Sequence, residues 1–94
     1  PWMGLFTAEV EGHVEVIGLA QDGPAEQAGL QAGDVIVKVN SQPIATMIDL
    51  YRKAWSSGKA GVDIPMTVLR DTYAFDLVVK SEDRYARLKF QYRA

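Results

Sequence analysis

The sequence predicts one mainly β domain that also contains two helices, an α+β arrangement. Several short runs rich in Val, Ile, Leu and Phe are separated by Gly, Asn, Asp and Pro, which is typical of strands joined by tight turns. Two further segments carry helix-capping residues or apolar residues at helical spacing. The 94 residues suffice for a single domain, and without cysteine no disulfide can supplement its core.

The first two predicted strands are residues 5–10 and 13–16, and apolar and polar residues alternate in the second. Glu11 and Gly12 lie between them and predict a two-residue hairpin turn, because glycine supplies the positive φ that such a turn needs.

A very short helix is predicted over residues 22–29. Asp22 or Gly23 can act as the N-cap, Pro24 suits the first helical position, and Gly29 can take the left-handed conformation after the helix.

A tight turn follows at residues 30–34, in which we expect Leu30 to enter the core and Gly33 to permit the reversal. Residues 35–39 are mostly β-branched and predict a strand, after which residues 40–43 turn the chain.

Thr46 is expected to cap a second helix over residues 47–55, closed by Gly58 and Gly61. Its apolar residues form one broad stripe: Met47, Leu50, Tyr51, Ala54 and Trp55. Residues 66–69 and 75–79 predict a final hairpin, turning at residues 70–73. Residues 81–94 show no clear apolar periodicity and are expected to form a terminal extension or a helix.

Charge and hydropathy disfavour a nucleic-acid partner and a membrane span. The first 37 residues hold six acidic residues and no Lys or Arg, whereas the last fifteen hold five basic ones. Five positive charges spread over that length are too few to indicate a nucleic-acid partner. No apolar run approaches the roughly 18 residues of a membrane span, so we expect no direct span.

An enzyme is also disfavoured. His13 is the only histidine, and no G-x-S-x-G elbow, phosphate loop or dinucleotide motif is present. Glu9, Glu11, His13 and Glu15 form an odd-numbered series that a metal could use, but alternation favours a solvated strand face. We therefore expect no catalytic residue, no metal and no cofactor.

Three motifs carry a resemblance to a known family. Residues 23–36 read GPAEQAGLQAGDVI, similar to x-P-A-x-x-A-G-L-x-x-G-D-x-I. Residues 39–44 read VNSQPI, similar to V-N-G-x-P-I, and residues 2–5 read WMGL, similar to an x-Φ-G-Φ loop. The chain thus resembles a bacterial-type PDZ domain, and most of all those of the HtrA/Deg family of trypsin-like serine proteases.

The resemblance implies a PDZ domain over residues 1–80 and a C-terminal extension over residues 81–94. Its fold would be a five- to six-stranded, partly open antiparallel barrel or sandwich, capped by a short and a longer helix. Two turns depart from the family pattern, because Ser41 stands where glycine is usual and Asp71-Thr72 replaces Asp/Asn-Gly. Both departures affect turn geometry and leave the groove alone.

The resemblance also implies a site for peptide C-termini. The carboxylate would be bound by main-chain N–H groups of Met3, Gly4 and Leu5. The ligand would pair with an edge strand made of Leu5, Phe6, Thr7 and Ala8. The second helix would form the opposite wall through Met47, Leu50, Tyr51 and Ala54. These apolar residues predict an apolar last residue in the ligand, although the same stripe, Leu50 above all, is equally well explained as core.

As the resemblance implies, the domain would recruit substrates for, or regulate, an attached serine protease in the bacterial cell envelope, in the periplasm. The alternative is a structural or assembly module whose groove is filled by its own tail or a neighbouring domain. The tail offers the apolar residues Tyr85, Leu88, Phe90 and Tyr92 for this role.

Overall fold

The computed structural model describes residues 2–56 and 63–82, and every predicted element within those ranges is present in the predicted order. The elements are β1 (Leu5–Val10), β2 (His13–Leu19), α1 (Pro24–Gln27), β3 (Val35–Val39), β4 (Gln42–Pro43), α2 (Met47–Ser56), β5 (Asp63–Arg70) and β6 (Tyr73–Lys80). The two-residue strand β4 is additional to the prediction, which had only a turn there.

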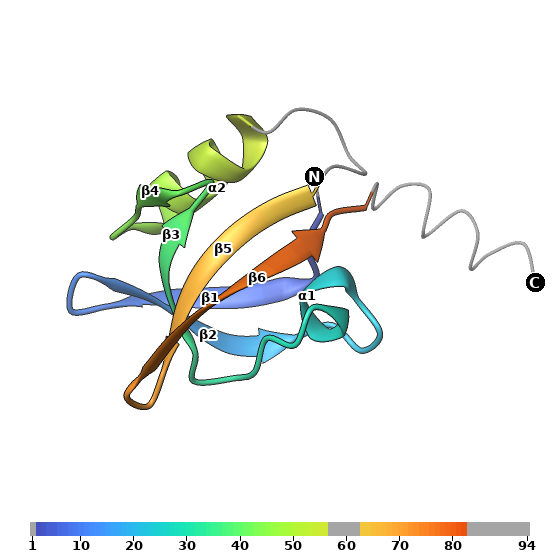
Figure 1. Ribbon diagram of the computed structural model, residues 1–94, viewed down its shortest axis with the longest axis horizontal. Coiled ribbons are helices and arrows are strands. Elements are labelled where there is room, and N and C mark those ends of the chain that lie inside the picture. The colour runs from blue at the N-terminus through green and yellow to red at the C-terminus, as the bar shows by residue number, and fades with distance from the viewer. Residues whose placement is uncertain (1, 57–62, 83–94) are drawn as a thin grey trace, which may run out of the picture.

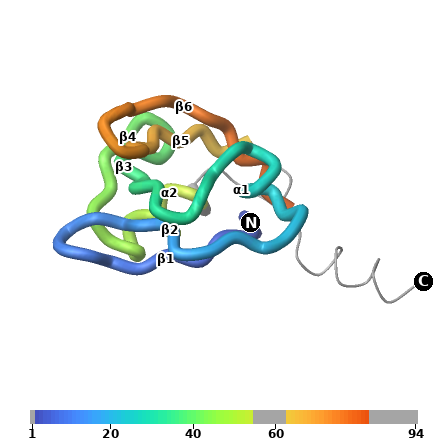
Figure 2. The backbone as a smooth tube through the Cα atoms, turned by 90° about the horizontal axis from the view of Figure 1, so that it is seen from below, coloured from blue at the N-terminus to red at the C-terminus, as the bar shows by residue number. Residues whose placement is uncertain are grey.

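The strands form one antiparallel sheet in the order β1-β2-β3-β5-β6, with β4 paired to β3. The sheet curls, so that β1 and β2 form one arm and β5 and β6 the other, with α2 between them in projection (Figure 2). In the view of Figure 1, α2 lies at the top of the molecule and the short helix α1 at its lower right. This arrangement confirms the predicted mainly β fold with two helices, and it leaves β1 as an outer strand.

The core lies inside the curl. The buried apolar residues on the strands alternate along the chain, as expected where one face of a strand is packed. Leu50 and Ala54 of α2 and Ala25 of α1 join the same cluster, and the predicted core residue Leu30 is buried with 3% exposure. The fully buried larger side chains are Ile36, Leu50, Ile64, Met66, Val14, Val16, Val39, Val68 and Val79.

The tight turns use positive φ at residues other than glycine. The predicted turn at residues 11–12 has φ values of 50° and 80° and is confirmed. Asn40 (φ 53°) and Ser41 (φ 65°) form a similar turn, so Ser41 adopts the left-handed conformation that glycine would take more easily. In the last hairpin Asp71 takes the positive φ (54°), which spares the β-branched Thr72.

The final hairpin is longer than predicted, since residues 66–69 and 75–79 cover only its middle. The predicted strand began at Met66, directly after Pro65, and proline cannot donate a ladder hydrogen bond. Pro65 is nevertheless in β5, beyond the last β3 pair at Met66, and it contributes its carbonyl to the N–H of Asn40 at 2.9 Å. The proline ring therefore interrupts no bond between β3 and β5.

The described chain ends in contact with its own beginning. Trp2 and Glu82 exchange two main-chain hydrogen bonds of 2.8 and 2.9 Å, and Ser81 is buried. The predicted closing residues Gly58 and Gly61, and the extension from residue 83 onward, lie outside the described residues.

Candidate functional site

A cleft of about 260 Å³ lies beside the start of β1. One side consists of Trp2, Met3, Gly4, Leu5, Phe6 and Thr7, and α2 contributes Leu50 and Tyr51 to the other. The fold thus brings together most of the residues that the sequence assigned to a site. Ala8, Met47 and Ala54 are not among the lining residues, and Ala54 is fully buried.

The backbone at Gly4 needs glycine for two reasons. Its φ of +69° lies in the left-handed region, and a Cβ atom there would come within 3.3 Å of the Pro24 ring. The same Cβ atom would lie 3.4 Å from Ala20 and from the backbone of Gly23. The loop is therefore packed closely on the segment that leads into α1.

Three successive carbonyl groups of this loop accept hydrogen bonds from donors elsewhere in the fold. The carbonyls of Trp2, Met3 and Gly4 accept from the N–H groups of Glu82, Ala25 and Ala20 at 2.9, 2.8 and 2.9 Å. No peptide bond is cis in the described chain, and a trans peptide directs its N–H opposite to its C=O. Each of these three carbonyls shares its peptide bond with the N–H group of the next residue. The N–H groups of Met3, Gly4 and Leu5 therefore point away from Glu82, Ala25 and Ala20, respectively.

β1 offers an open edge next to this loop. In a two-residue hairpin the residues flanking the turn form a hydrogen-bonded pair, and the two kinds of pair then alternate along the ladder. Thr7 and Glu9 therefore direct their N–H and C=O groups away from β2. Beyond an irregularity after Phe6 the same holds for Leu5, because the adjacent bond runs from Ala20 to Gly4.

The side chains of β1 divide between two faces. Thr7 and Glu9 stand opposite the buried Val16 and Val14, so they lie on the face that carries the core and α2. Phe6 lies on the other face and is 58% exposed. The hydroxyl oxygen of Thr7 is buried and has no hydrogen-bond partner among the described residues.

The start of α2 is held by three side-chain acceptors. Thr46 Oγ1 accepts from the N–H of Asp49 at 3.0 Å, which confirms the predicted cap. The Asp49 carboxylate accepts from Ala45, and this bond is the main reason that the pKa of Asp49 lies below its ordinary value. Glu9 reaches across from β1 and accepts from the N–H of Met47 at 2.6 Å. This last hydrogen bond links β1 to the start of α2, outside the residues that line the cleft.

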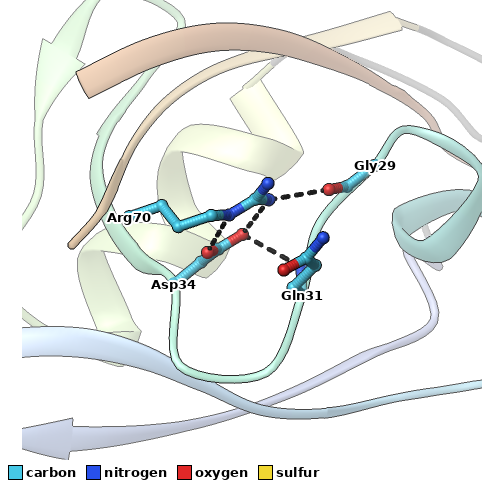
Figure 3. A network of polar contacts seen from close by, with 4 residues as sticks. All are labelled: Gly29, Gln31, Asp34 and Arg70. Atoms are coloured by element: carbon cyan, nitrogen blue, oxygen red, sulfur yellow. Dashed lines mark hydrogen bonds and ion pairs between the residues drawn. The ribbon is translucent and has the colours of Figure 1, made fainter. Parts of the chain in front are cut away.

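An ion pair with a buried carboxylate ties the end of β5 to the turn that follows α1 (Figure 3). Asp34 is 1% exposed, and both of its oxygens accept from Arg70 at 2.8 Å. Gln31 N–H also donates to the carboxylate at 2.9 Å, and Arg70 donates to the carbonyl of Gly29 at 2.8 Å. The Arg70 guanidinium lies 4.7 Å from the ring centre of Phe75.

The bond from Arg70 is the largest reason that the pKa of Asp34 lies below its ordinary value, with the Gln31 N–H adding to it. Arg70 was not predicted from the sequence as a partner of this carboxylate. The available signal was the acid inside the motif Gly33-Asp34-Val35, since an acid beside buried strand residues requires a donor.

A second cleft of similar volume lies over β5 and β6, near the turn at Ser41. Its polar groups include Thr67 and Asp76, which satisfy each other through a 2.6 Å hydrogen bond. None of the residues that line this cleft is one that the sequence assigned to a binding site, so it is the weaker candidate.

Within residues 2–56 and 63–82, no three His, Cys, Asp or Glu side chains are grouped so that they could hold a metal ion. No helix in that part of the chain is long and apolar enough to cross a membrane.

Comparison with known proteins agrees with these features. The family model "PDZ domain" matches residues 15–70. A probable periplasmic serine protease do/HhoA-like of Haemophilus influenzae is 41% identical over 56 residues, covering 60% of this chain and 12% of that protein. A probable periplasmic serine endoprotease DegP-like of Pseudomonas fluorescens is 37% identical over 82 residues, covering 74% of this chain and 17% of the relative.

Among solved structures, the HtrA3 PDZ domain bound to a phage-derived ligand (FGRWV) superimposes with a TM-score of 0.72 and 22% identity. The match covers 86% of this chain and 84% of that one, and it shows a shared fold. In contrast, the chain spans only 12 to 17% of the length of the two curated relatives.

Proposed function

This chain belongs to the PDZ domain family, and on that premise we propose that it binds polypeptide C-termini by β-strand addition to β1. The observation that carries the proposal is the arrangement of the loop at residues 2–5. The carbonyls of Trp2, Met3 and Gly4 accept hydrogen bonds from the fold, which leaves the N–H groups of Met3, Gly4 and Leu5 available for an anion.

The ligand strand continues from this loop along the open edge of β1. Its last residue lies opposite Leu5 and its third-from-last residue opposite Thr7, where the main-chain groups of β1 point outward. The last side chain enters the cleft between the loop and α2. Met3, Leu5, Leu50 and Tyr51 line that cleft, so Val, Ile, Leu, Ala or Phe is the preferred last residue.

The role of the module follows from the relatives. Both curated relatives are named as periplasmic serine proteases, and this chain corresponds to a small part of each. We propose that it recruits substrates for, or regulates, an attached HtrA-type protease in the periplasm. The chemistry of peptide-bond cleavage belongs to that attached domain, and the PDZ module supplies recognition.

The direct test compares two forms of one heptapeptide, acetyl-Gly-Ser-Ala-Gly-Thr-Trp-Val, whose last two residues are those of the HtrA3 ligand. The free acid is expected to bind with a Kd of about 1 μM in calorimetry. The C-terminal amide is expected to bind at least tenfold more weakly, a difference of about 1.4 kcal/mol, since it removes the anion. Equal binding of the two forms contradicts carboxylate capture.

One structural feature keeps the assembly alternative open to test. Glu82 pairs with Trp2, which lines the cleft, so the described part of the chain ends beside the cleft. A deletion that begins at residue 83 preserves this pair, whereas one that begins at residue 81 removes it along with the buried Ser81. If the full chain does not bind the peptide and deletion of residues 83–94 restores binding, the tail occupies the groove in the full chain.

A further inference from the structure

We propose that Glu9 selects a Lys or Arg side chain at the ligand residue four positions before the last, here called position −4. This inference rests on the proposed function, because it extends the same groove beyond the cleft to the far end of β1. It adds a charged specificity site to a groove that has no charged side chain in its lining.

The register of the sheet places position −4 opposite Glu9. A ligand strand antiparallel to β1 advances one residue for each residue of β1, so positions 0, −2 and −4 face Leu5, Thr7 and Glu9. These three residues direct their main-chain groups to the open edge. Directly opposed residues of an antiparallel pair place their side chains on the same face, about 5 Å apart at Cβ.

The carboxylate of Glu9 is held in place on that face. Oε1 accepts from the N–H of Met47 at 2.6 Å, which ties the side chain to the first turn of α2. The ordering cost of fixing a glutamate is therefore already met before any ligand binds. Oε2 accepts no hydrogen bond from the described residues and remains available to a cationic side chain.

The charge of Glu9 also lacks a cation within the described part of the chain. The ion pair between Arg70 and Asp34 does not involve Glu9. The nearby start of α2 carries Asp49, whose carboxylate already accepts from Ala45 and feels the charge of Arg52. A Lys or Arg at position −4 supplies the missing cation, whereas an acidic residue there meets Glu9 as a like charge.

The test measures four free-acid heptapeptides, acetyl-Gly-Ser-Xaa-Gly-Thr-Trp-Val, with Lys, Arg, Ala or Glu as Xaa. Cross-strand charge pairs change affinity about threefold in either direction, so Lys and Glu should differ about tenfold at low salt. In Glu9→Gln the amide oxygen can still accept from Met47, so the groove is preserved while the charge is lost. Glu15→Gln is the matched control, because Glu15 faces the opposite side of the same hairpin.

The expected result is a Lys-to-Glu ratio of about ten in the wild type and in Glu15→Gln, and below about two in Glu9→Gln. The wild-type ratio should also shrink toward one as salt rises to 1 M, where the screening length is about 3 Å. Equal binding of all four peptides overturns this inference and leaves the carboxylate site intact. A ratio that survives in Glu9→Gln overturns it as well, and failure of every peptide to bind overturns both.

Discussion

Replacing Gly4 by alanine tests both the packing of the loop and its proposed use. Gly4 and Gly12 have similar positive φ values, +69° and +80°, and they lie at opposite ends of β1. A Cβ atom at Gly12 meets nothing within 4 Å, whereas one at Gly4 meets Pro24 and two other residues at 3.3 to 3.4 Å. Gly12→Ala is therefore a control with the same backbone strain and no crowding.

The magnitudes follow from these two contributions. Placing an alanine side chain in the left-handed region destabilises the folded state by about 1 to 2 kcal/mol. Replacing glycine also lowers the conformational entropy of the unfolded chain, which stabilises the protein by about 0.4 to 1 kcal/mol. Gly12→Ala should thus lower the free energy of unfolding by about 1 kcal/mol. Gly4→Ala adds crowding against a proline ring and a backbone atom, which costs at least about 1 kcal/mol more.

Urea unfolding of the three proteins gives the stability difference, and calorimetry with the free-acid heptapeptide gives the affinity. We expect Gly4→Ala to lose about 2 to 3 kcal/mol of stability and at least tenfold in affinity, because the loop must shift. Gly12→Ala should bind as the wild type does. Equal destabilisation by both variants would refute the packing argument, and full affinity in a folded Gly4→Ala would refute the assignment of the loop amides.

Three other predictions concern the support of the site. The pKa of Asp34 is lowered in the folded protein, so its contribution is present above 3.8, the ordinary value, and is lost as the pH falls through the lower folded-state pKa. In urea unfolding, Asp34→Asn should therefore be about 2 kcal/mol less stable than the wild type at pH 7. This stability difference should shrink below pH 3.8, and a difference that stays constant with pH would contradict the ion pair with Arg70. Thr7→Val should raise stability by about 1 kcal/mol in the same assay by removing a buried hydroxyl without a partner, and a loss would mean that the hydroxyl is satisfied. Leu50→Ala should lower the free energy of unfolding by about 3 kcal/mol, because Leu50 is buried. The Tyr51 side chain is 45% exposed, so Tyr51→Ala should lower it by under about 1 kcal/mol but weaken peptide binding severalfold. Unchanged peptide binding by Tyr51→Ala would exclude Tyr51 from the groove wall.

The loop of the candidate site was predictable because its features are local. Gly4 stands within a short motif, and the requirement for glycine at a positive φ is a property of one residue. The turn at residues 11–12 and the cap at Thr46 were predicted for the same reason, since their chemistry involves neighbours along the chain.

The helix wall was less predictable. The apolar stripe of α2 predicted Leu50, Tyr51 and Ala54 equally as possible ligand contacts. Periodicity shows that one face of a helix is apolar, but it does not show what that face packs against. In the fold Ala54 is wholly buried, Tyr51 is 45% exposed, and Leu50 serves the core while still lining the cleft. Only the position of α2 over the curled sheet separates these roles.

The sequence by itself determined the elements, their order and the turns, because strand alternation, caps and left-handed glycines depend on residues a few positions apart. The tertiary structure alone decided the long-range partners: Glu9 with Met47, 38 residues away, and Asp34 with Arg70, 36 residues away. The local sequence around a charged or polar residue does not indicate which distant group it will bind. That choice is made when burial of the apolar faces brings the strands into register and leaves each buried donor and acceptor to find a partner.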